Sequence, residues 1–549
     1  MIAPDQWRPV AVELLEPGAK QAVTMTKGSA VVVANPGSGK TELLAQRADF
    51  LLRTGICRYP KKILAISFKN DAARTLRRRV ADRSGFDHAH RIDSMTFHGF
   101  ARRIIQIFRP LLRGKDQLDP GFKVGTNRVG RVQVAFDELL PLAQRLIDQY
   151  PMVKRSVNMA YSHVFLDEFQ DCTTEQLLLI RTLFKDAQVN FTAVGDAKQM
   201  IMGFAGALEG VMEDFAQEFN ATRLGLIQNW RSDSAIRRVL NRMVAVMEPQ
   251  SSVPEHEIQG KDGSVYWEHF ASEQDEAKAI ARQIAAWIEQ GIAPHEIAIL
   301  HRAQPHFFNQ AIEVELDRLE IPYRSEQELQ DLSSEPLAQL IVNVLRVISE
   351  KSAPDAYTAA LYALTESAED DQRDWVGMLH QSRSMLMKCQ ENRASLALQL
   401  VQKIIESLGQ SGVMALSSDS DAQRIKELQE EIFSKLRSLV GRYGELEQAL
   451  ARFCEKGAVR VMTMHKCKGM EFGCVVMPGT EAQTWWGGEL GNRRSFFVGV
   501  SRAKHSLVVT CAASRACPDG ANKSKWSTAR ETHQEFAGYF NPGSMALSA

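Results

Sequence analysis

Short apolar runs alternate with stretches of helical periodicity along most of the chain. Each run is bounded by turn or loop residues, and several are apolar at every position, which is typical of buried parallel strands joined by helices. The runs lie at 30–34, 63–67, 164–166, 191–194, 297–300, 459–463, 474–477 and 507–510. They form one group before about residue 230 and a second from about 265 onward, so the pattern predicts two α/β sheets.

Two long stretches between these runs have helical patterning and no clear strand. They span 102–160 and roughly 336–453, and we interpret them as helical insertions in the two α/β units. A Gly- and Ser-rich segment at 409–421 predicts a flexible loop within the second insertion. The tail from 513, rich in Ser, Ala, Gly and Lys, predicts poor order apart from a short helix near 528–536.

These features divide the chain into two lobes, each in two parts. The first lobe is predicted at 1–101 and 161–228, with its insertion at 102–160. The second is predicted at 229–335 and 454–512, with its insertion at 336–453 and a tail at 513–549. The fold class is therefore α/β, with two parallel-sheet lobes that each carry a mainly helical insertion.

Composition adds one point of interest, the distribution of charge. At 549 residues the chain should hold several domains, and its apolar share of 44% and charged share of 24% are ordinary for a soluble globular protein. Formal net charge is zero, so any polyanion must meet a local basic surface. Residues 74–115 hold eleven Lys or Arg against three Asp and no Glu. On its own such a run more often indicates a solvated helix face than a nucleic-acid site.

Cysteine usage and hydropathy bear on the compartment. The eight cysteines form no CxxC pair and no spacing suited to a metal, which is typical of reduced thiols. The N-terminus lacks a basic-then-apolar signal, and no run approaches the about 18 apolar residues that a membrane span needs. We therefore expect a cytoplasmic protein with no membrane partner.

The chemistry begins with the loop ANPGSGKT at 34–41, which follows an apolar run and precedes a helical pattern. Glycines let backbone N–H groups approach phosphates, Lys40 supplies a point charge, and the Thr41 hydroxyl can hold Mg²⁺. Ala34 stands where this motif usually has glycine. The loop predicts that the chain binds a nucleoside triphosphate with Mg²⁺.

Three further segments indicate which reaction of the triphosphate the chain catalyses. Asp167 and Glu168 end an apolar run, where the first carboxylate of such a pair holds Mg²⁺ and the second polarises the attacking water. Gln199 follows the run at 191–194 and is placed to sense a γ-phosphate. Trp230 and Arg231 offer an aromatic face and a cation. Each feature alone has an ordinary structural explanation, but their order after a phosphate loop favours ATP hydrolysis.

The ordered set resembles the superfamily 1 DNA helicases of the UvrD/Rep/PcrA family. The segments that carry the resemblance, besides those above, are ISFKNDAA at 66–73, TFHGF at 96–100, GFAGA at 203–207, VMTMHKCKGMEF at 461–472 and FVGVSRA at 497–503. The resemblance implies two RecA-like lobes with ATP bound between them, movement 3′ to 5′ on single-stranded DNA, and unwinding of forked duplexes. It also favours nucleic acid as the partner of the basic run at 74–115.

The family's functional residues map onto this chain position by position. Catalytic roles are implied for Lys40, Asp167, Glu168, Gln199, Arg231 and Arg502, the two arginines as arginine fingers. Nucleotide contacts are implied for Gln21, Pro36, Gly37, Ser38, Gly39, Lys40, Thr41, Arg77, Trp230, Gly469 and Glu471, and Mg²⁺ ligation for Thr41 and Asp167. DNA contacts are implied for Phe68, Asn70, Thr96, Phe97, His98, Phe204, Thr463, His465 and Lys468.

Departures from the family pattern qualify these assignments. A stacking tyrosine of the family is Met202 here and an arginine is Ala205, which predicts weaker or less processive stepping. The adenine-reading glutamine has no clean context, with Gln21 the nearest candidate and Gln6 a distant one, which predicts loose adenine selectivity. The second insertion also lacks the family's GGxxFFxRxE signature after 321–324.

Two readings remain open. The first is a DNA-dependent ATPase that translocates on single strands and unwinds duplex. The second is a nucleotide-switched subunit that gates a partner, such as a nuclease of an anti-phage system like Gabija, to which the compact length also corresponds. A phosphate-loop kinase or GTPase would leave the segments after 195 unexplained.

Overall fold

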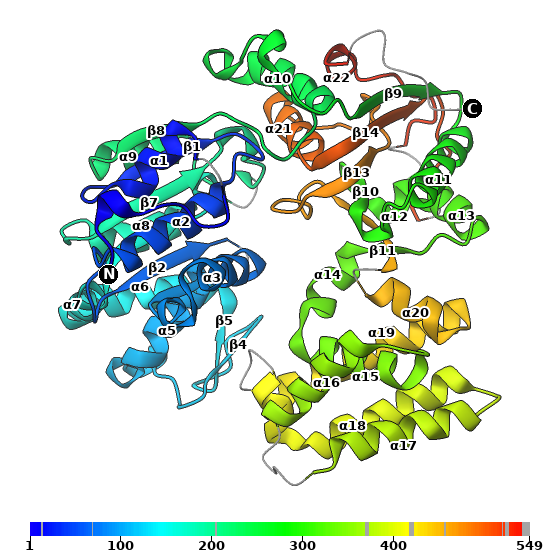
Figure 1. Cartoon of the computed structure of the whole chain (residues 1–549), viewed down its shortest axis with the longest axis horizontal. Coiled ribbons are helices and arrows are strands. Elements are labelled where there is room, and N and C mark those ends of the chain that lie inside the picture. Colours follow the sequence, from blue (N-terminus) through cyan, green and yellow to red (C-terminus); the bar gives the residue numbers. More distant parts are fainter. Residues whose placement is uncertain are drawn as a thin grey trace. The chain divides into compact units, whose positions relative to one another are not determined.

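The computed structural model of the chain describes residues 1–12, 15–68, 70–203, 206–367, 373–416, 422–454, 457–518, 520–521 and 526–540. The chain forms two compact units (Figure 1). Unit 1 comprises Met1–Ser264 together with Gly487–His505, and unit 2 comprises Val265–Trp486 together with the chain from Ser506 onward. Each unit contains its own six-stranded sheet, so the predicted fold class is confirmed.

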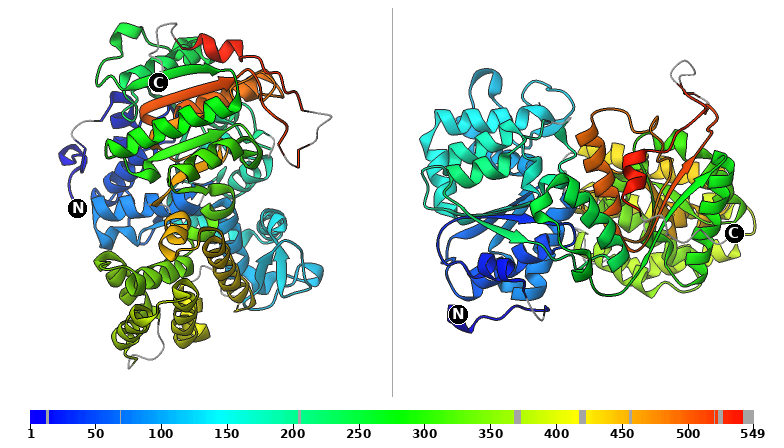
Figure 2. Two further views of the ribbon diagram at one scale, coloured as in Figure 1. Left: turned by 90° about the vertical axis from the view of Figure 1, so that its right-hand side faces the viewer. Right: turned by 90° about the horizontal axis from the view of Figure 1, so that it is seen from above.

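The sheet of unit 1 is parallel and has the strand order β3-β2-β6-β7-β1-β8. Its strands are β1 (Ala30–Ala34), β2 (Lys62–Ser67), β3 (Ile92–Thr96), β6 (Tyr161–Leu166), β7 (Asn190–Gly195) and β8 (Thr222–Leu226). Successive side chains of a strand point to opposite faces, and two separate cores show this alternation. Val31 packs in one core and Val32 in the other. Helices cover both faces (Figure 2), which explains why the inner strands β2, β6, β7 and β1 are largely apolar on both sides.

The helices of unit 1 follow the strands in an α/β alternation. They are α1 (Pro17–Thr24), α2 (Lys40–Arg53), α3 (Asn70–Ser84), α4 (Phe86–Ala89), α5 (Phe97–Phe108), α6 (Leu139–Gln149), α7 (Pro151–Ala160), α8 (Thr174–Phe184), α9 (Val211–Glu218), α10 (Ser234–Met247) and α21 (Glu489–Val500). Short 3-10 turns include η4 (Phe136–Glu138), η5 (Phe169–Asp171) and η6 (Ala197–Gln199). The last two directly follow strand ends of the sheet.

The first insertion is not purely helical. Between α5 and α6 lies a two-stranded ribbon of β4 (Lys123–Gly125) and β5 (Gln133–Ala135). The prediction of no strand within 102–160 is therefore wrong for this ribbon. Each strand has only three residues, too few for an alternating pattern to stand out in the sequence.

The sheet of unit 2 has the order β11-β12-β10-β13-β14-β9, and β11, β12, β10 and β13 pair in parallel. Its strands are β9 (Ser264–Phe270), β10 (Ile297–His301), β11 (Tyr323–Ser325), β12 (Val459–Thr463), β13 (Phe472–Met477) and β14 (Ala503–Ala512). The helices beside it are α11 (Glu273–Glu289), α12 (Pro305–Phe308), α13 (Gln310–Arg318) and α22 (Gln534–Gly538).

The second insertion is a bundle of helices with a hydrophobic core of its own. Its helices are α14 (Glu326–Ser334), α15 (Pro336–Ser349), α16 (Pro354–Ser367), α17 (Trp375–Lys388), α18 (Arg393–Leu416), α19 (Ala422–Tyr443) and α20 (Leu446–Phe453). The flexible loop predicted at 409–421 is wrong for 409–416, which continue α18 past a non-helical Gly409 with φ 76°. Residues 417–421 lie outside the described part of the chain.

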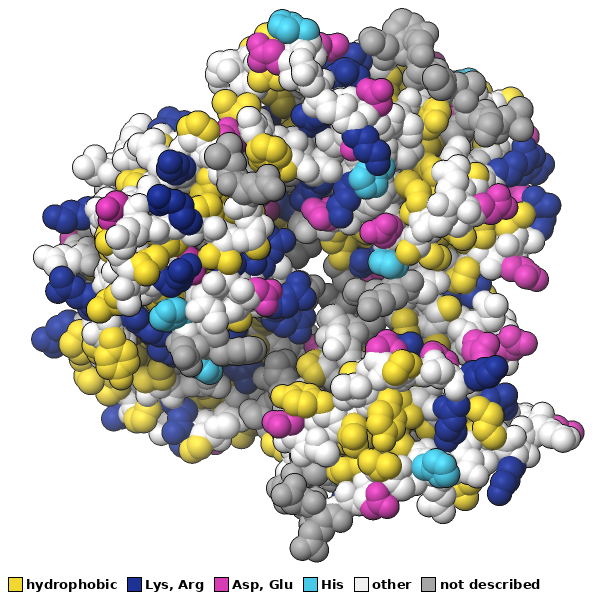
Figure 3. All heavy atoms as spheres, viewed as in Figure 1, with side chains coloured by type: hydrophobic (Ala, Val, Ile, Leu, Met, Phe, Trp, Pro, Cys, Tyr) yellow, Lys and Arg dark blue, Asp and Glu magenta, His cyan; other side chains and the backbone are white. Residues whose placement is uncertain are grey.

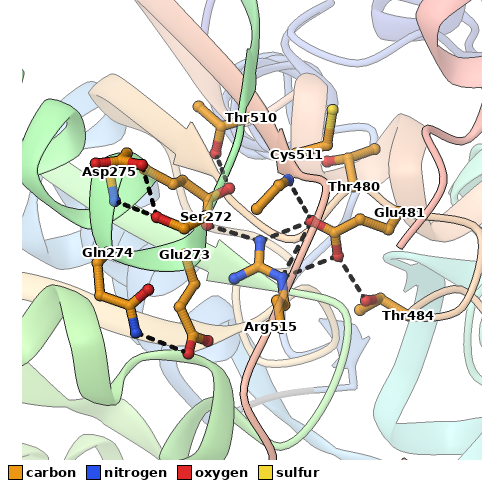
Figure 4. Close-up of polar contacts among 12 residues, drawn as sticks. Ser272, Glu273, Gln274, Asp275, Thr480, Glu481, Thr484, Thr510, Cys511 and Arg515 are labelled. Atoms are coloured by element: carbon orange, nitrogen blue, oxygen red, sulfur yellow. Dashed lines mark hydrogen bonds and ion pairs between the residues drawn. The ribbon is translucent and has the colours of Figure 1, made fainter. Parts of the chain in front are cut away.

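The segment after 512 packs against unit 2, which corrects the prediction of a poorly ordered tail for 513–518 and 526–540. Arg515 inserts between two buried carboxylates, those of Glu276 and Glu481, and Figure 4 shows its contacts with Glu481. Phe536 is fully buried. The helix predicted near 528–536 is α22, which begins later, at Gln534. The composition of this segment did not indicate its packing, because the packing depends on a few buried side chains.

The strands that the hydrophobic pattern missed include both outermost strands of each large sheet. These are β3 and β8 in unit 1, and β9 and β11 in unit 2. An outermost strand is flanked by another strand on only one side, so it need not be apolar throughout. Leu226, for example, is the one buried residue of β8. Among the helices that the structure describes, none is long and apolar enough to cross a membrane.

Candidate nucleotide site and nucleic-acid contacts

Four adjacent strands of unit 1 deliver the predicted catalytic segments to one edge of the sheet. The phosphate loop follows β1, Asp167 and Glu168 follow β6, the turn η6 follows β7, and the segment 227–233 follows β8. In a parallel sheet the carboxyl ends of the strands lie at the same edge, where such folds bind ligands. The strand order therefore gathers residues that are far apart in the sequence.

The phosphate loop has the backbone geometry that its glycines allow. Gly37 and Gly39 have φ values of 71° and 85°, in the left-handed region that other residues avoid. Ser38 donates its hydroxyl hydrogen bond to the Asn35 carbonyl at 2.7 Å, which closes the turn. Lys40 begins the 14-residue α2, so the loop ends at a helix N-terminus, a suitable place for phosphate.

The segment after β8 packs directly on this loop. The Trp230 amide donates to the Gly37 carbonyl at 3.0 Å. Asn229 Oδ1 accepts hydrogen bonds from the amides of Arg231 at 2.8 Å and Ser232 at 3.1 Å. A Cβ at Gly37 would lie 2.2 Å from Asn229 Oδ1, so this position requires glycine for space as well as for conformation. The indole of Trp230 is 67% exposed and available for stacking.

A series of hydrogen bonds, one of them from the backbone amide of Asp196, joins Glu168 to Arg502. Gln170 Nε2 donates to Glu168 Oε2 at 2.6 Å, and Gln170 Oε1 accepts from the Asp196 amide at 3.0 Å. Gln199 Nε2 then donates to Asp196 Oδ2 at 2.7 Å, and Arg502 Nη2 donates to Gln199 Oε1 at 2.6 Å. The carboxylate predicted to polarise water is thus connected to the predicted γ-phosphate sensor and to an arginine finger.

The two predicted arginine fingers share a neighbour, Ser501 at the end of α21. Arg231 Nη1 donates to the Ser501 carbonyl at 3.0 Å, and Arg502 Nη2 donates to the Ser501 hydroxyl at 2.8 Å. Arg502 is only 2% exposed, and its Nε donates to the Val498 carbonyl. The structure therefore brings Gln199, Arg231 and Arg502 together within unit 1.

Two charged side chains near Gln199 are buried. Asp196 is fully buried and Lys198 is 5% exposed. Burial by itself lowers the pKa of Lys198, but the carboxylates of Asp196 and Glu248 outweigh it and raise the pKa above its ordinary value. Lys198 is thus a buried cation held charged by its partners.

The residues predicted to hold Mg²⁺ are chemically suited to it. Thr41 lies in the first turn of α2, and Asp167 is 4% exposed at the end of β6, where its Oδ1 accepts from the Glu168 amide at 3.0 Å. Mg²⁺ prefers oxygen ligands and keeps several waters beside one or two protein groups and the substrate phosphates. Within the described ranges there is no cluster of three or more His, Cys, Asp or Glu that could hold a metal by itself.

Comparison with known proteins agrees with this geometry. The model of the UvrD/REP helicase N-terminal domain matches residues 15–127 and 124–220. Models of the UvrD-like helicase C-terminal domain match 224–356 and 458–510. These matches span most of both units and include every segment at the sheet edge. The chain belongs to the UvrD/REP helicase family.

Curated relatives of the family align over most of the chain. DNA helicase II of Haemophilus influenzae is 25% identical over 616 residues, covering 90% of this chain and 84% of that protein. DNA helicase II of Escherichia coli gives the same identity and coverage. The ATP-dependent DNA helicase PcrA of Leuconostoc citreum is 24% identical, with 90% and 81% covered. Membership confirms the predicted enzyme class, the ATP hydrolases of the helicase family.

Four other predicted nucleotide contacts belong to α1, to α3 and to the loop after β12. Gln21 is exposed on α1 and Arg77 is exposed on α3. Gly469, with φ 85°, and the exposed Glu471 follow β12 in unit 2. Their roles as nucleotide contacts remain predictions.

The predicted DNA contacts of unit 1 form an aromatic group at the start of α5. The Phe68 and Phe97 rings meet edge to face at 5.7 Å, and His98 stacks on Phe136 with ring centroids 4.1 Å apart. Phe97 is 2% exposed, so in this structure its ring supports Phe68 and offers no face to a base. Burial lowers the pKa of His98, which favours the neutral ring. Thr96 accepts the Gly99 amide at 3.1 Å and so caps α5.

Two predicted DNA contacts cannot be placed. Phe204 lies outside the described residues, as does the side chain of Asn70. In unit 2 the predicted contacts lie at the end of β12 and in the loop after it. Thr463 accepts from Gln327 Nε2 at 3.0 Å. Lys468 is only 6% exposed, whereas His465 is half-buried, and burial is the main cause that lowers its pKa.

The basic run at 74–115 is partly neutralised by neighbouring acids. Arg79 and Arg83 both pair with Glu42, at 3.3 and 2.7 Å, and Arg103 pairs with Asp93 at 2.9 Å. Lys and Arg side chains are spread over the face of unit 1 drawn in Figure 3. The run thus contributes both structural ion pairs and exposed cations such as Arg77 and Arg78.

Five residues that organise these sites were not predicted from the sequence, namely Gln170, Asp196, Asn229, Ser501 and Phe136. Four of them stand within recognised segments, and three of these, Gln170, Asp196 and Asn229, are polar residues within four positions of the end of a strand. Because a buried polar group must find a partner, such residues in a catalytic segment indicate a hydrogen-bond network. Nothing in the local sequence marks Phe136, whose ring is 53% exposed and stacks on His98 only through the tertiary fold.

Proposed function

We propose that this protein uses ATP hydrolysis to move along single-stranded DNA and to separate forked duplexes, with 3′ to 5′ polarity by family resemblance. The proposal includes the two lobes predicted from the sequence, with the nucleotide bound between them. The first lobe comprises 1–101 and 161–228, and the second comprises 229–335 and 454–512. The observation that carries it is the hydrogen-bonded chain from Glu168 through Gln170, Asp196 and Gln199 to Arg502.

The chain of contacts suits a γ-phosphate switch. The loop amides and Lys40 would hold the phosphates, and Glu168 would accept a proton from the attacking water. Mg²⁺ held by Thr41 and Asp167 would neutralise charge that develops on the phosphates. Arg502 donates at 2.6 Å to the neutral Gln199 amide oxygen, and a phosphate oxygen is a stronger acceptor for the same guanidinium. Binding and loss of the γ-phosphate would therefore change the hydrogen-bond partners of Arg502 and Gln199.

DNA would be held by stacking and backbone contacts. Exposed or half-exposed rings such as Phe68 and His98 can support bases without regard to sequence, at about 1–3 kcal/mol each. Cations along 74–115 would follow the phosphates. Movement would follow when opening and closing around ATP shifts the two sets of contacts relative to each other.

The test is steady-state ATP hydrolysis by the purified protein with and without oligo(dT), beside Lys40→Ala and Arg502→Ala. We expect strong stimulation by DNA and a loss of hydrolysis in both variants. For Arg502→Ala the loss should be about 10³-fold or more, as for arginine fingers in related phosphoryl transfers. A wild-type protein inactive on every DNA would contradict the proposal. Activity that appears only with an added nuclease would favour the partner-gating alternative.

A further inference from the structure

Lys198 forms a buried ion pair that connects the Gln199 turn to the far end of α10. Its Nζ lies 2.6 Å from Glu248 Oε2 and 3.2 Å from Asp196 Oδ1. Lys198 is 5% exposed, Asp196 is fully buried, and the Glu248 side chain is 27% exposed. Lys198 thus attaches the three-residue turn η6 to Asp196, which precedes the turn, and to Glu248, which follows α10.

Asp196 divides its two oxygens between Lys198 and Gln199. Oδ1 faces Lys198, whose amide also donates to it at 3.1 Å, while Oδ2 accepts from Gln199 Nε2 at 2.7 Å. Because the Gln199 amide group donates on that side, its Oε1 must point the other way, toward Arg502. The charge on Lys198 therefore helps to hold the orientation on which the Gln199–Arg502 contact depends.

Glu248 connects the same turn to the segment that carries Arg231. It directly follows α10, and its amide donates to the Val244 carbonyl at 2.7 Å, so it is fixed to the last turn of that helix. The opposite end of α10 begins at Ser234, just after Arg231. A helix is a stiff connector, so a contact at its last turn can influence the segment at its first.

We propose that Lys198 and Glu248 are a positioning pair that couples the γ-phosphate sensor to α10 and thereby to DNA-stimulated hydrolysis. The inference rests on the proposed function and adds to it two residues outside the predicted site. Lys198 touches no reacting atom. Its part is to keep the turn η6 aligned with both arginines while the nucleotide changes.

The experiment compares Glu248→Gln with a matched control, Glu218→Gln. Both changes remove a carboxylate that lies 2.6 Å from a cation in unit 1. Glu218, however, pairs with Arg181 and joins α9 to α8, helices without a nucleotide-site residue. Steady-state ATP hydrolysis is measured with and without oligo(dT), together with the thermal unfolding midpoint of each protein.

We expect Glu248→Gln to lower the ratio of DNA-stimulated to basal kcat by at least about fivefold, the lower end of usual coupling between sites, with the KM for ATP nearly unchanged. Glu218→Gln should keep the wild-type ratio. Equal ratios in the two variants would overturn the inference, as would a loss explained wholly by a lower unfolding midpoint.

Two further proteins separate coupling from folding. Lys198→Arg keeps the charge and should retain most of the ratio, whereas the double variant Lys198→Met with Glu248→Gln should lose little more than Lys198→Met alone. Additive losses would show that the two residues act independently and would refute the pair. A wild-type protein without DNA stimulation would instead remove the proposed function, and the inference with it. Stimulation in the wild type with an unchanged Glu248→Gln would remove the inference alone.

Discussion

Replacing Arg515 with methionine should destabilise unit 2 severely, because two buried carboxylates depend on this one cation. Arg515 Nη2 donates to Glu276 Oε2 at 2.6 Å and to Glu481 Oε1 at 2.7 Å, and its Nε lies 3.1 Å from both Glu481 oxygens (Figure 4). All three residues are at most 3% exposed. The variant would leave two interior carboxylates with hydroxyl and amide donors only, from Thr510, Thr484 and the backbone.

The magnitude follows from the burial of the cluster. Removing one partner of a buried ion pair costs about 3–5 kcal/mol, because the remaining charge is left uncompensated. For a unit of this size that loss corresponds to a fall of about 6–20 °C in its unfolding midpoint. The matched control is Arg318→Met, because Arg318 is 60% exposed and pairs with Glu315 on α13 of the same unit. Exposed pairs contribute about 0–1 kcal/mol.

The dependence on pH gives the result a second, independent test. Burial raises the pKa of Glu276 even with Arg515 beside it, and loss of Arg515 would raise it further. A carboxyl whose pKa is higher in the folded than in the unfolded state binds more protons when folded. Its stabilising effect is therefore present at low pH and is lost as the pH rises through the folded value.

The deficit of Arg515→Met relative to wild type should accordingly shrink between pH 8 and pH 5.5. Urea or thermal unfolding followed by circular dichroism measures it at both values. A loss of less than about 1 kcal/mol at pH 8 would refute the reasoning. So would a deficit that does not change with pH.

Three other changes probe the site and the core. Gly37→Ala places a Cβ 2.2 Å from Asn229 Oδ1 at a positive φ, and should weaken ATP binding at least about tenfold by fluorescent-nucleotide titration; unchanged binding would contradict the packing. Gln170→Leu removes the hydrogen-bonded link between Glu168 and Asp196 and should lower kcat about tenfold or more with little change in KM. A KM that changes by the same factor as kcat would contradict this role of Gln170. Burial lowers the pKa of His163 to about 3, so its contribution to stability is present above pH 6.5 and is lost below it by about 1.4 kcal/mol per pH unit. His163→Gln should flatten unfolding free energy between pH 6.5 and 5, and an unchanged slope would exclude this histidine as the cause.

The central strands and the predicted catalytic segments could be identified from the sequence because each is a pattern of residues that are neighbours in the chain. The strand β1 and its phosphate loop, for example, need only an apolar run followed by glycines and Lys40. The same holds for Asp167 and Glu168 after β6 and for Gln199 after β7. In a parallel sheet these segments must lie at one edge, so the candidate site followed once the sheet was predicted.

Short strands and packed loops within the stretches of helical patterning, and after residue 512, could not be predicted from the sequence. The ribbon of β4 and β5 and the packed segment around Arg515 have no periodic signal, since each depends on a few residues. The outermost strands β3, β8, β9 and β11 were missed for a related reason. A strand with a neighbour on one side only can be partly polar and resemble a loop.

The sequence by itself determined the α/β class, the order of the segments that lie at the sheet edge and most of the residues that we predict to act on ATP. These depend on short-range patterns that the chemistry itself requires. Only the tertiary structure decided which polar groups meet, because such contacts join residues far apart in the chain. Gln199 and Arg502 are separated by 303 positions, and Glu276 and Arg515 by 239. Each pair forms only when strand order and burial bring two distant segments together and leave each buried polar group with the other as its partner.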